Sequence, residues 1–315
     1  MSETSKASVT FVEIGPEEAG QRLDNYLIRR LKGVPKSHIY RIVRGGEVRV
    51  NKGRTDVTYR LAEGDVLRIP PVRVAEKPAS TAVQAASGQL ELEILFEDDA
   101  LIAINKPSGV AVHGGSGISF GVIELLRAQR PQAKFLELVH RLDRETSGLL
   151  LIAKKRSALV KLHEMLRDNH QIDKRYLALV QGVWPEPRSH VRFKLLKYET
   201  PGGERRVKKS ADGLTSHTVV NRKAKFADAS LLECELKTGR THQIRVHLAE
   251  SGHPILGDDK YGDPALNRLL PRAGLKRMFL HAWRLTLSHP LTAEKLTLEA
   301  PLPGELQTYL DTLAE

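Results

Sequence analysis

Residues 138–155 read LVHRLDRETSGLLLIAKK, and the apolar run at 149–153 limits what the chain can fold into. The run lacks the alternation of polar and apolar residues that marks a strand with one face in water. Short apolar runs bounded by turn residues are typical of strands covered on both faces, and FLELVH at 135–140 has the same character. We therefore expect two buried strands in a sheet with packing on both sides.

Between these two runs, RLDRETSG at 141–148 is predicted to be a loop or bulge that carries Asp143 near the core. A buried carboxylate without a partner is strongly disfavoured. A lone aspartate in a loop would pair with Arg141 or Arg144 and have no further role. The position between two buried strands favours a functional role instead.

The length of 315 residues is enough for one large and one small domain. We predict an N-terminal extension at 1–19, a small domain at 20–73, a linker at 74–90 and an α+β domain at 91–315. The linker sequence is rich in Ala, Ser and Pro and has no apolar periodicity. Beyond it, β-prone runs alternate with helical stretches to the end of the chain.

The small domain combines two predicted helices with short strands. The second helix opens after a proline and buries an apolar stripe, which leaves Lys36, Arg41 and Arg44 on its outer edge. Residues 21–73 contain 13 Lys and Arg against 5 Asp and Glu, which is +8 of the chain's net charge of +11. Such an edge suits contacts with phosphates. In a less basic segment a solvated helix face would be the simpler interpretation.

The overall charge favours a polyanionic partner. The single cysteine, Cys234, excludes an internal disulfide and a multi-cysteine metal site, and is expected to pack in a strand. The N-terminal residues lack the pattern of a secretory signal, and no apolar run approaches the roughly 18 residues of a membrane span. We therefore expect a cytoplasmic protein that does not enter a membrane.

Two further segments stand out. In residues 236–262 a helix of about three turns is predicted, with Thr241 as its N-cap and Arg245 in its first turns. His242 and His247 are about 140° apart on such a helix, so they form a poor metal pair and are expected to be structural. Residues 174–184 are predicted to be a strand that carries Tyr176, which taken alone would be an ordinary packing residue.

Six segments occur in the order found in one enzyme family: INKPSGVAVHGG, HRLDRETSGLLLIAKK, KRYLALVQG, KTGRTHQIRVH, GHPILGDDKYG and FLHAWRLTLSHP. The chain resembles RNA pseudouridine synthases of the RluA type over residues 20 to about 305, with no departure at the motif positions. Residues 21–70 resemble the S4 RNA-binding module. The resemblance implies an α+β catalytic domain, with a mixed, largely antiparallel sheet and flanking helices, preceded by a small S4-like α/β domain.

The resemblance also implies roles for residues. Asp143 corresponds to the catalytic aspartate, which acts either as a nucleophile on C1′ or as a base that removes the 2′ proton. Arg245 corresponds to the arginine that pairs with it. Tyr176 matches the tyrosine that stacks on the target base, and Arg141 the position that fills the gap left in the RNA, although phosphate binding is nearly as well supported for Arg141. Ile244 would line the base pocket, or be ordinary core.

The implied reaction isomerises a uridine that is flipped out of its RNA, and it needs no cofactor. No GxGxxG motif, P-loop or cysteine cluster is present in the sequence. The implied partner is ribosomal RNA of the large subunit (23S). Three alternatives are weaker: a synthase for another structured RNA, a non-catalytic ribosome-binding protein, and a hydrolase that pairs Asp143 with a histidine.

Overall fold

The computed structural model of the protein describes residues 8–31, 33–72, 91–114, 120–168 and 171–314. The chain divides into two compact units, residues 1–84 and 85–315, and each is described here by itself. The linker predicted at 74–90 lies outside the described residues. None of the helices in the described ranges is long and apolar enough to cross a bilayer.

The smaller unit consists of β1 (Thr10–Glu13), α1 (Leu23–Arg30), α2 (Lys36–Arg44), β2 (Arg49–Val50) and β3 (Val66–Ile69). Its strands form an antiparallel sheet in the order β1-β3-β2. β1 lies within the segment predicted as an N-terminal extension, and its pairing with β3 makes it part of this sheet. Helix α2 begins directly after Pro35, as expected, and buries Ile39, Ile42 and Val43 against the core of the unit.

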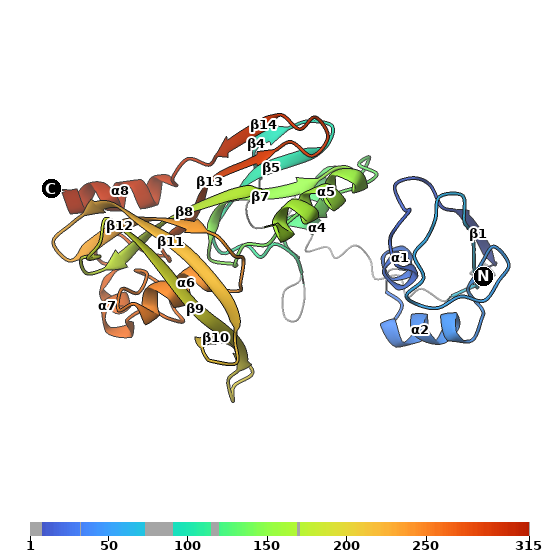
Figure 1. Cartoon of the computed structure of the whole chain (residues 1–315), viewed down its shortest axis with the longest axis horizontal. Coiled ribbons are helices and arrows are strands. Elements are labelled where there is room, and N and C mark those ends of the chain that lie inside the picture. The colour runs from blue at the N-terminus through green and yellow to red at the C-terminus, as the bar shows by residue number, and fades with distance from the viewer. Residues whose placement is uncertain (1–7, 32, 73–90, 115–119, 169–170, 315) are drawn as a thin grey trace, which may run out of the picture. The chain divides into compact units, whose positions relative to one another are not determined.

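The elements of the larger unit are, in chain order, β4 (Glu93–Glu97), β5 (Leu101–Lys106), α4 (Val122–Gln129), β6 (Glu137–Leu138), β7 (Ser147–Ala153), α5 (Arg156–Arg167), β8 (Ile172–Gln181), β9 (Arg188–Glu199), β10 (Arg205–Lys209), β11 (Leu214–Lys225), β12 (Ala229–Leu236), α6 (Gln243–Glu250), α7 (Pro264–Leu269), β13 (Leu280–Ser288), β14 (Lys295–Glu299) and α8 (Gly304–Ala314) (Figure 1).

In the described part of this unit the strands form one sheet of eleven, with the central path β10-β9-β11-β12-β8-β13-β7-β5-β4. The ladders along this path are antiparallel except at β13 and β7, which pair in parallel through His281 and Ser147. β14 adds to β13, and β6 adds to β7. The expectation of an α+β fold with a mixed, largely antiparallel sheet is confirmed.

Both faces of β5 and β7 are covered. All seven residues of β7 are buried, as the unbroken apolar run predicted. Leu150 and Ile152 belong to the hydrophobic cluster that includes α4, whereas Leu149 and Leu151 belong to the cluster that includes α5. Successive side chains of a strand point to opposite faces, so the two helices pack on opposite sides of these strands.

The strand expected from FLELVH is much shorter than predicted, since only Glu137 and Leu138 form β6. One edge of β7 is taken along its length by β5. The other edge is shared between β13, at Ser147 and Gly148, and β6, which pairs with the far end of β7. β6 ends at Leu138 because side chains replace the next backbone partners: Nε2 of His140 accepts the N–H of Leu151, and His163 of α5 binds the carbonyl oxygen of Val139.

Gly148 stands where the loop carrying Asp143 enters β7. It has a φ of +107°, and a Cβ atom here would lie 2.2 Å from the carbonyl oxygen of Ala282 on β13. Only glycine allows this close approach between the two strands. The glycine after RLDRETS therefore fixes where the loop ends and the buried strand begins.

The helix predicted after Thr241 is shorter than expected and has a different N-cap. α6 spans eight residues from Gln243, and the N-cap position is held by His242 in a left-handed conformation, with φ +52°. Because His242 is not helical, the helix cannot extend back to Thr241. Arg245 nevertheless lies in the first turn, as predicted.

Candidate active site

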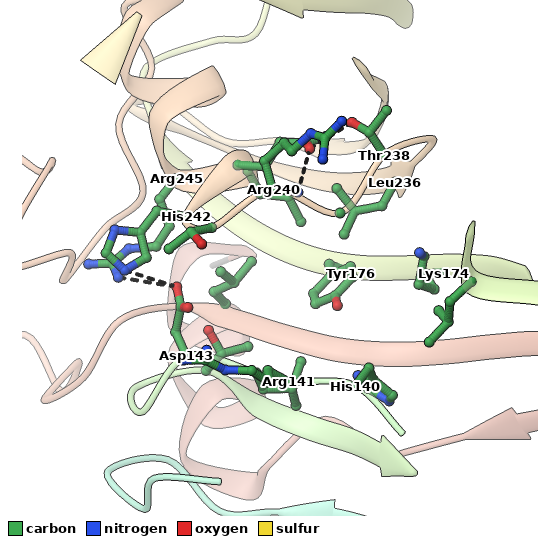
Figure 2. Close-up of a pocket in the computed structure, with 18 of the residues that line it drawn as sticks. His140, Arg141, Asp143, Lys174, Tyr176, Leu236, Thr238, Arg240, His242 and Arg245 are labelled. Carbon is green, nitrogen blue, oxygen red and sulfur yellow. Dashed lines mark hydrogen bonds and ion pairs between the residues drawn. The ribbon is translucent and has the colours of Figure 1, made fainter. Parts of the chain in front are cut away.

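A cavity of about 540 Å³ lies between the loop that precedes β7, strand β8 and the start of α6. Its lining includes all five residues that the sequence placed in a catalytic pocket: Arg141, Asp143, Tyr176, Ile244 and Arg245. Figure 2 shows that Asp143, Tyr176 and Arg245 come from three separate parts of the chain and surround one space. The fold thus brings together side chains that are up to 104 positions apart.

Hydrogen bonds from the end of β5 and the residues after it hold the loop that carries Asp143. Lys106 is fully buried, and its ammonium donates hydrogen bonds to three backbone carbonyl oxygens, including that of Arg144 at 3.0 Å. The hydroxyl of Ser108 donates to the carbonyl oxygen of Glu145 at 2.7 Å. Burial lowers the pKa of Lys106 to about 7. Sequence reasoning did not identify this support; a lysine that ends the apolar strand LIAIN was the available signal.

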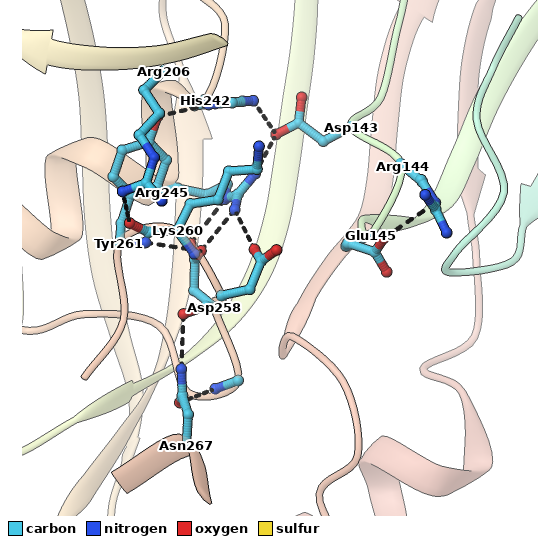
Figure 3. Close-up of polar contacts among 12 residues, drawn as sticks. Asp143, Arg144, Glu145, Arg206, His242, Arg245, Asp258, Lys260, Tyr261 and Asn267 are labelled. Carbon is cyan, nitrogen blue, oxygen red and sulfur yellow. Dashed lines mark hydrogen bonds and ion pairs between the residues drawn. The ribbon is translucent and has the colours of Figure 1, made fainter. Parts of the chain in front are cut away.

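Arg245 contacts three carboxylates, and Figure 3 shows two of them, Asp143 and Asp258. Its Nε and Nη2 donate to the two carboxylate oxygens of Asp258, at 2.8 and 2.6 Å. The remaining nitrogen, Nη1, lies 3.3 Å from Oδ2 of Asp143. The exposed Asp259 is a third carboxylate partner, with its Oδ1 3.2 Å from Nη2. The pairing of Arg245 with Asp143 implied by the resemblance is present, but the two-pronged partner is Asp258, which the sequence did not single out.

Arg245 and Asp258 are buried, whereas Asp143 remains accessible to a substrate. The side chains of Arg245 and Asp258 are 3% and 0% exposed, whereas that of Asp143 is 29% exposed. Burial opposes the charge of Arg245, but the hydrogen-bonded carboxylate of Asp258 outweighs it and the pKa of Arg245 is raised. Burial likewise opposes the charge of Asp258, and the hydrogen bonds from Arg245 lower its pKa overall. The buried pair fixes a cation beside the accessible carboxylate of Asp143.

Tyr176 and Ile244 form part of the apolar wall of the cavity. Tyr176 projects from β8 and is 8% exposed, and Ile244, in the first turn of α6, is 4% exposed. Burial, and secondarily the charge of Asp143, raise the pKa of Tyr176, so its phenol stays protonated at neutral pH. An aromatic ring beside an aliphatic side chain can hold a planar base by stacking.

His242 and Tyr261 adjoin the same carboxylate and were not predicted to do so. Nε2 of His242 lies 3.8 Å from Oδ2 of Asp143, and its Nδ1 lies 2.7 Å from the hydroxyl of Tyr261. The guanidinium of Arg245 lies over the ring of Tyr261, 5.1 Å from its centroid. Burial lowers the pKa of His242, partly opposed by the charge of Asp143, so the imidazole is neutral near pH 7. His242, which was expected to be structural and not a metal ligand, therefore lies beside Asp143.

A second hollow, of about 770 Å³, also reaches Asp143. Asp143, Arg141 and Arg245 line both hollows. The walls of the second one include the hairpin of β9 and β10 and the loop after β5, and its cations are Lys197, Arg205, Arg206, Lys260 and Arg144 together with the shared arginines. A polyanion could lie in this hollow while one of its residues enters the apolar cavity.

On the smaller unit, Lys36, Arg41 and Arg44 are exposed along α2, as predicted. They surround Tyr40, with the ammonium of Lys36 and the guanidinium of Arg44 at 5.5 and 5.8 Å from its ring centroid. The hydroxyl of Tyr40 donates to buried Asp24 at 2.8 Å, which fixes the ring beneath the cations. The surface therefore combines positive charge with an anchored aromatic.

Within the described ranges, no three His, Cys, Asp or Glu side chains are grouped so that they could hold a metal ion. Cys234 is buried in β12, as expected, and burial raises the pKa of its thiol.

Comparison with known proteins is consistent along the whole chain. Residues 100–250 match the family described as RNA pseudouridylate synthase, and residues 21–67 match the S4 domain. Ribosomal large subunit pseudouridine synthase C of Haemophilus ducreyi is 54% identical over 314 residues, covering 99% of this chain and 98% of that protein. The protein of the same name in Escherichia coli (strain K12) is 53% identical over 315 residues, covering 98% of each. Among solved structures, human RNA pseudouridylate synthase domain containing 4 matches with a TM-score of 0.59 and 27% identity, over 75% of this chain and 97% of that one.

Proposed function

The chain belongs to the RNA pseudouridine synthase family and is an enzyme of that class, and we propose that it isomerises uridine to pseudouridine in large-subunit (23S) ribosomal RNA. The observation that carries the proposal is Asp143, an accessible carboxylate held by a buried, doubly anchored arginine at the mouth of a cavity lined by Tyr176. The proposed RNA substrate is taken from the names of the relatives, which are similar to this chain over almost its full length.

In this reaction the N1–C1′ bond of the uridine breaks, the uracil turns within the site, and C5 forms the new bond to C1′. The proton on C5 is released and N1 gains one, so the composition of the nucleotide is unchanged. Asp143 must be ionised, whether it attacks C1′ or removes the 2′ proton. The guanidinium of Arg245 lies 3.3 Å from Oδ2 of Asp143 and orients the carboxylate through a charge-assisted hydrogen bond.

The remaining residues of the cavity hold the base. A uridine within a structured RNA must leave its stack to reach Asp143, and stacking on an aromatic face replaces part of what it loses. We assign this role to Tyr176, with Ile244 packing against the base. We also propose that Tyr176 assists removal of the C5 proton. Arg141, exposed at the rim of both hollows, is assigned to the RNA strand, where it fills the gap left by the base or binds a phosphate.

The smaller unit belongs to the S4 family of domains. We propose that Lys36, Arg41 and Arg44 bind phosphates of the ribosomal RNA and so add affinity without contacting the reacting base. We place the enzyme in the cytoplasm, where its substrate is found in bacteria. The reaction as proposed uses no cofactor.

The test is Asp143→Asn, which preserves the shape of the side chain and removes its charge. We expect no pseudouridine to form in 23S RNA transcribed without modifications, while RNA affinity stays within about threefold of wild type because phosphate contacts elsewhere dominate it. Asp311→Asn, on the exposed face of α8, is the matched control and should retain full turnover. Measurable turnover by Asp143→Asn would refute the assignment of the site.

A further inference from the structure

Asp143 has two contacts that fall on the same carboxylate oxygen. Figure 3 shows Arg245 and His242 both directed at its Oδ2, with distances of 3.3 Å from Nη1 and 3.8 Å from Nε2. They approach from a helix and from the residue that precedes it. Two donors on one oxygen leave the other oxygen, Oδ1, to face a substrate.

The hydrogen bonds of Tyr261 define which nitrogen of His242 carries the proton. The backbone N–H of Val207 donates to the Tyr261 hydroxyl oxygen at 2.9 Å, so the hydroxyl's own proton is free for its second neighbour, Nδ1 of His242, at 2.7 Å. We assign Nδ1 as the acceptor on this basis. A neutral imidazole then carries its proton on Nε2, which is the nitrogen that faces Asp143.

The backbone at His242 supports a specific use of this side chain. A φ of +52° is uncommon for a residue with a side chain and costs on the order of 1 kcal/mol or more. An N-cap residue usually accepts a hydrogen bond from the helix with a short polar side chain, whereas His242 makes no such bond. Its imidazole is instead directed to Tyr261 and Asp143.

We propose that His242 is a positioning residue for the isomerisation: its Nε2–H and the Nη1–H of Arg245 together hold Oδ2 of Asp143, so that Oδ1 is turned toward the ribose of the flipped uridine. Tyr261 keeps the imidazole in the required tautomer. This inference rests on the function proposed above. The 3.8 Å separation is longer than a hydrogen bond, and it shortens when RNA displaces water from the site, as catalytic hydrogen bonds commonly do on substrate binding.

A purely structural role for His242 predicts a different ranking of variants from a positioning role. His242→Asn fits the left-handed backbone well, but its amide is too short to reach Asp143. His242→Gln fits that backbone less well, but its amide N–H can stand where Nε2–H stood. A positioning role therefore predicts faster turnover for His242→Gln than for His242→Asn. A structural role predicts that His242→Asn is as fast as His242→Gln, or faster.

The experiment measures kcat and KM on unmodified 23S RNA for the full-length variants, with unfolding followed by tryptophan fluorescence. We expect His242→Asn to lose about 100-fold in kcat with KM nearly unchanged, since a displacement of about 1 Å at the reacting group has effects of this size. His242→Gln should recover at least tenfold of that loss. Equal kcat for both variants, or a higher kcat for Asn, would overturn the proposal.

Tyr261→Phe tests the tautomer separately. Loss of the hydroxyl should lower kcat severalfold in the wild-type background and have no further effect on top of His242→Gln, because an amide has no tautomer to fix. Tyr309→Phe, which removes a hydroxyl from α8, is the control and should leave kcat unchanged. Equal effects of Tyr261→Phe on kcat in both backgrounds would contradict the assigned tautomer of His242.

Asp143→Asn is measured alongside these variants. If it is inactive while His242→Asn keeps the wild-type kcat, the inference about His242 fails and the proposed function stands. If Asp143→Asn itself turns over, the proposed site fails, irrespective of His242.

Discussion

Replacing Asp258 by Asn tests whether the buried ion pair with Arg245 supports the site. The substitution keeps the shape of the side chain and removes its charge. The guanidinium of Arg245, whose side chain is only 3% exposed, then lacks its buried counter-charge. The remaining carboxylates, Asp143 and Asp259, contact it at 3.3 and 3.2 Å through single nitrogens. Neither replaces the two hydrogen bonds, of 2.8 and 2.6 Å, that Asp258 accepts.

Removing one partner of a buried ion pair typically destabilises a protein by about 3–5 kcal/mol. We expect about 3 kcal/mol for Asp258→Asn, because the amide oxygen can still accept one hydrogen bond from Arg245. This is a large part of the roughly 5–15 kcal/mol that stabilises a typical domain. Asp259→Asn is the matched control: Asp259 contacts the same guanidinium but its side chain is 68% exposed, so its loss should cost less than about 1 kcal/mol.

Urea unfolding monitored by tryptophan fluorescence is a suitable assay, because the two tryptophans, Trp184 and Trp283, both belong to the larger unit. The signal therefore reports the unit that contains Arg245, and not the smaller one. A difference of about 2 kcal/mol or more between Asp258→Asn and Asp259→Asn is expected. If the two variants unfold with equal free energies, burial is not what distinguishes the two carboxylates, and the reasoning is wrong.

Three other predictions address the RNA-binding surface, pH and metal ions. Neutralising Lys36, Arg41 and Arg44 together to Gln should weaken binding to 23S RNA and make the slope of log affinity against log salt shallower by about 2; an unchanged slope would exclude this surface. Burial lowers the pKa of His247 and His281 to about 4. The unfolded chain therefore binds more protons than the folded one between pH 6.5 and 4. The free energy of unfolding should fall as the pH is lowered through this window, by up to about 1.4 kcal/mol per pH unit for each histidine. A free energy of unfolding that stays constant between pH 7 and 5 would contradict this. Turnover on a short unstructured RNA should survive EDTA, and inactivation that a divalent ion reverses would show that the reaction as proposed is incomplete.

Local patterns predicted the parts of the fold that depend on near neighbours. The unbroken apolar run of β7, the amphipathic helix α2 after Pro35 and the placement of Arg245 in a first helical turn all followed from residues within one or two turns of each other. The predictions failed where a distant segment intervened. β6 ends where His163 of α5 binds the carbonyl oxygen of Val139 in place of β7, and α6 begins at Gln243 because His242 is turned into a left-handed conformation, with its imidazole bound to Tyr261.

The motifs likewise pointed to the residues of the cavity but not to those that hold them. Lys106 and Asp258 are buried groups, and the partners that tie them to the site, Arg144 and Arg245, lie 38 and 13 positions away in the sequence. Nothing in the segment GDDKYG distinguishes Asp258 from Asp259, yet the structure leaves one side chain 0% and the other 68% exposed. Which of two adjacent acids becomes the anchor depends on how the loop after α6 packs on that helix.

The sequence by itself determined that this chain has a two-sided sheet, a basic helical edge at Lys36, Arg41 and Arg44, and an aspartate set in a loop between apolar segments, because these features depend on composition and short-range periodicity. The resemblance implied that Asp143 pairs with Arg245, but only the tertiary structure decided that Asp258 fixes the guanidinium and that His242, bound to Tyr261, approaches the same carboxylate. Those contacts depend on the register of strands that pair across the whole unit, and no local pattern encodes the distance between two side chains on different strands and loops.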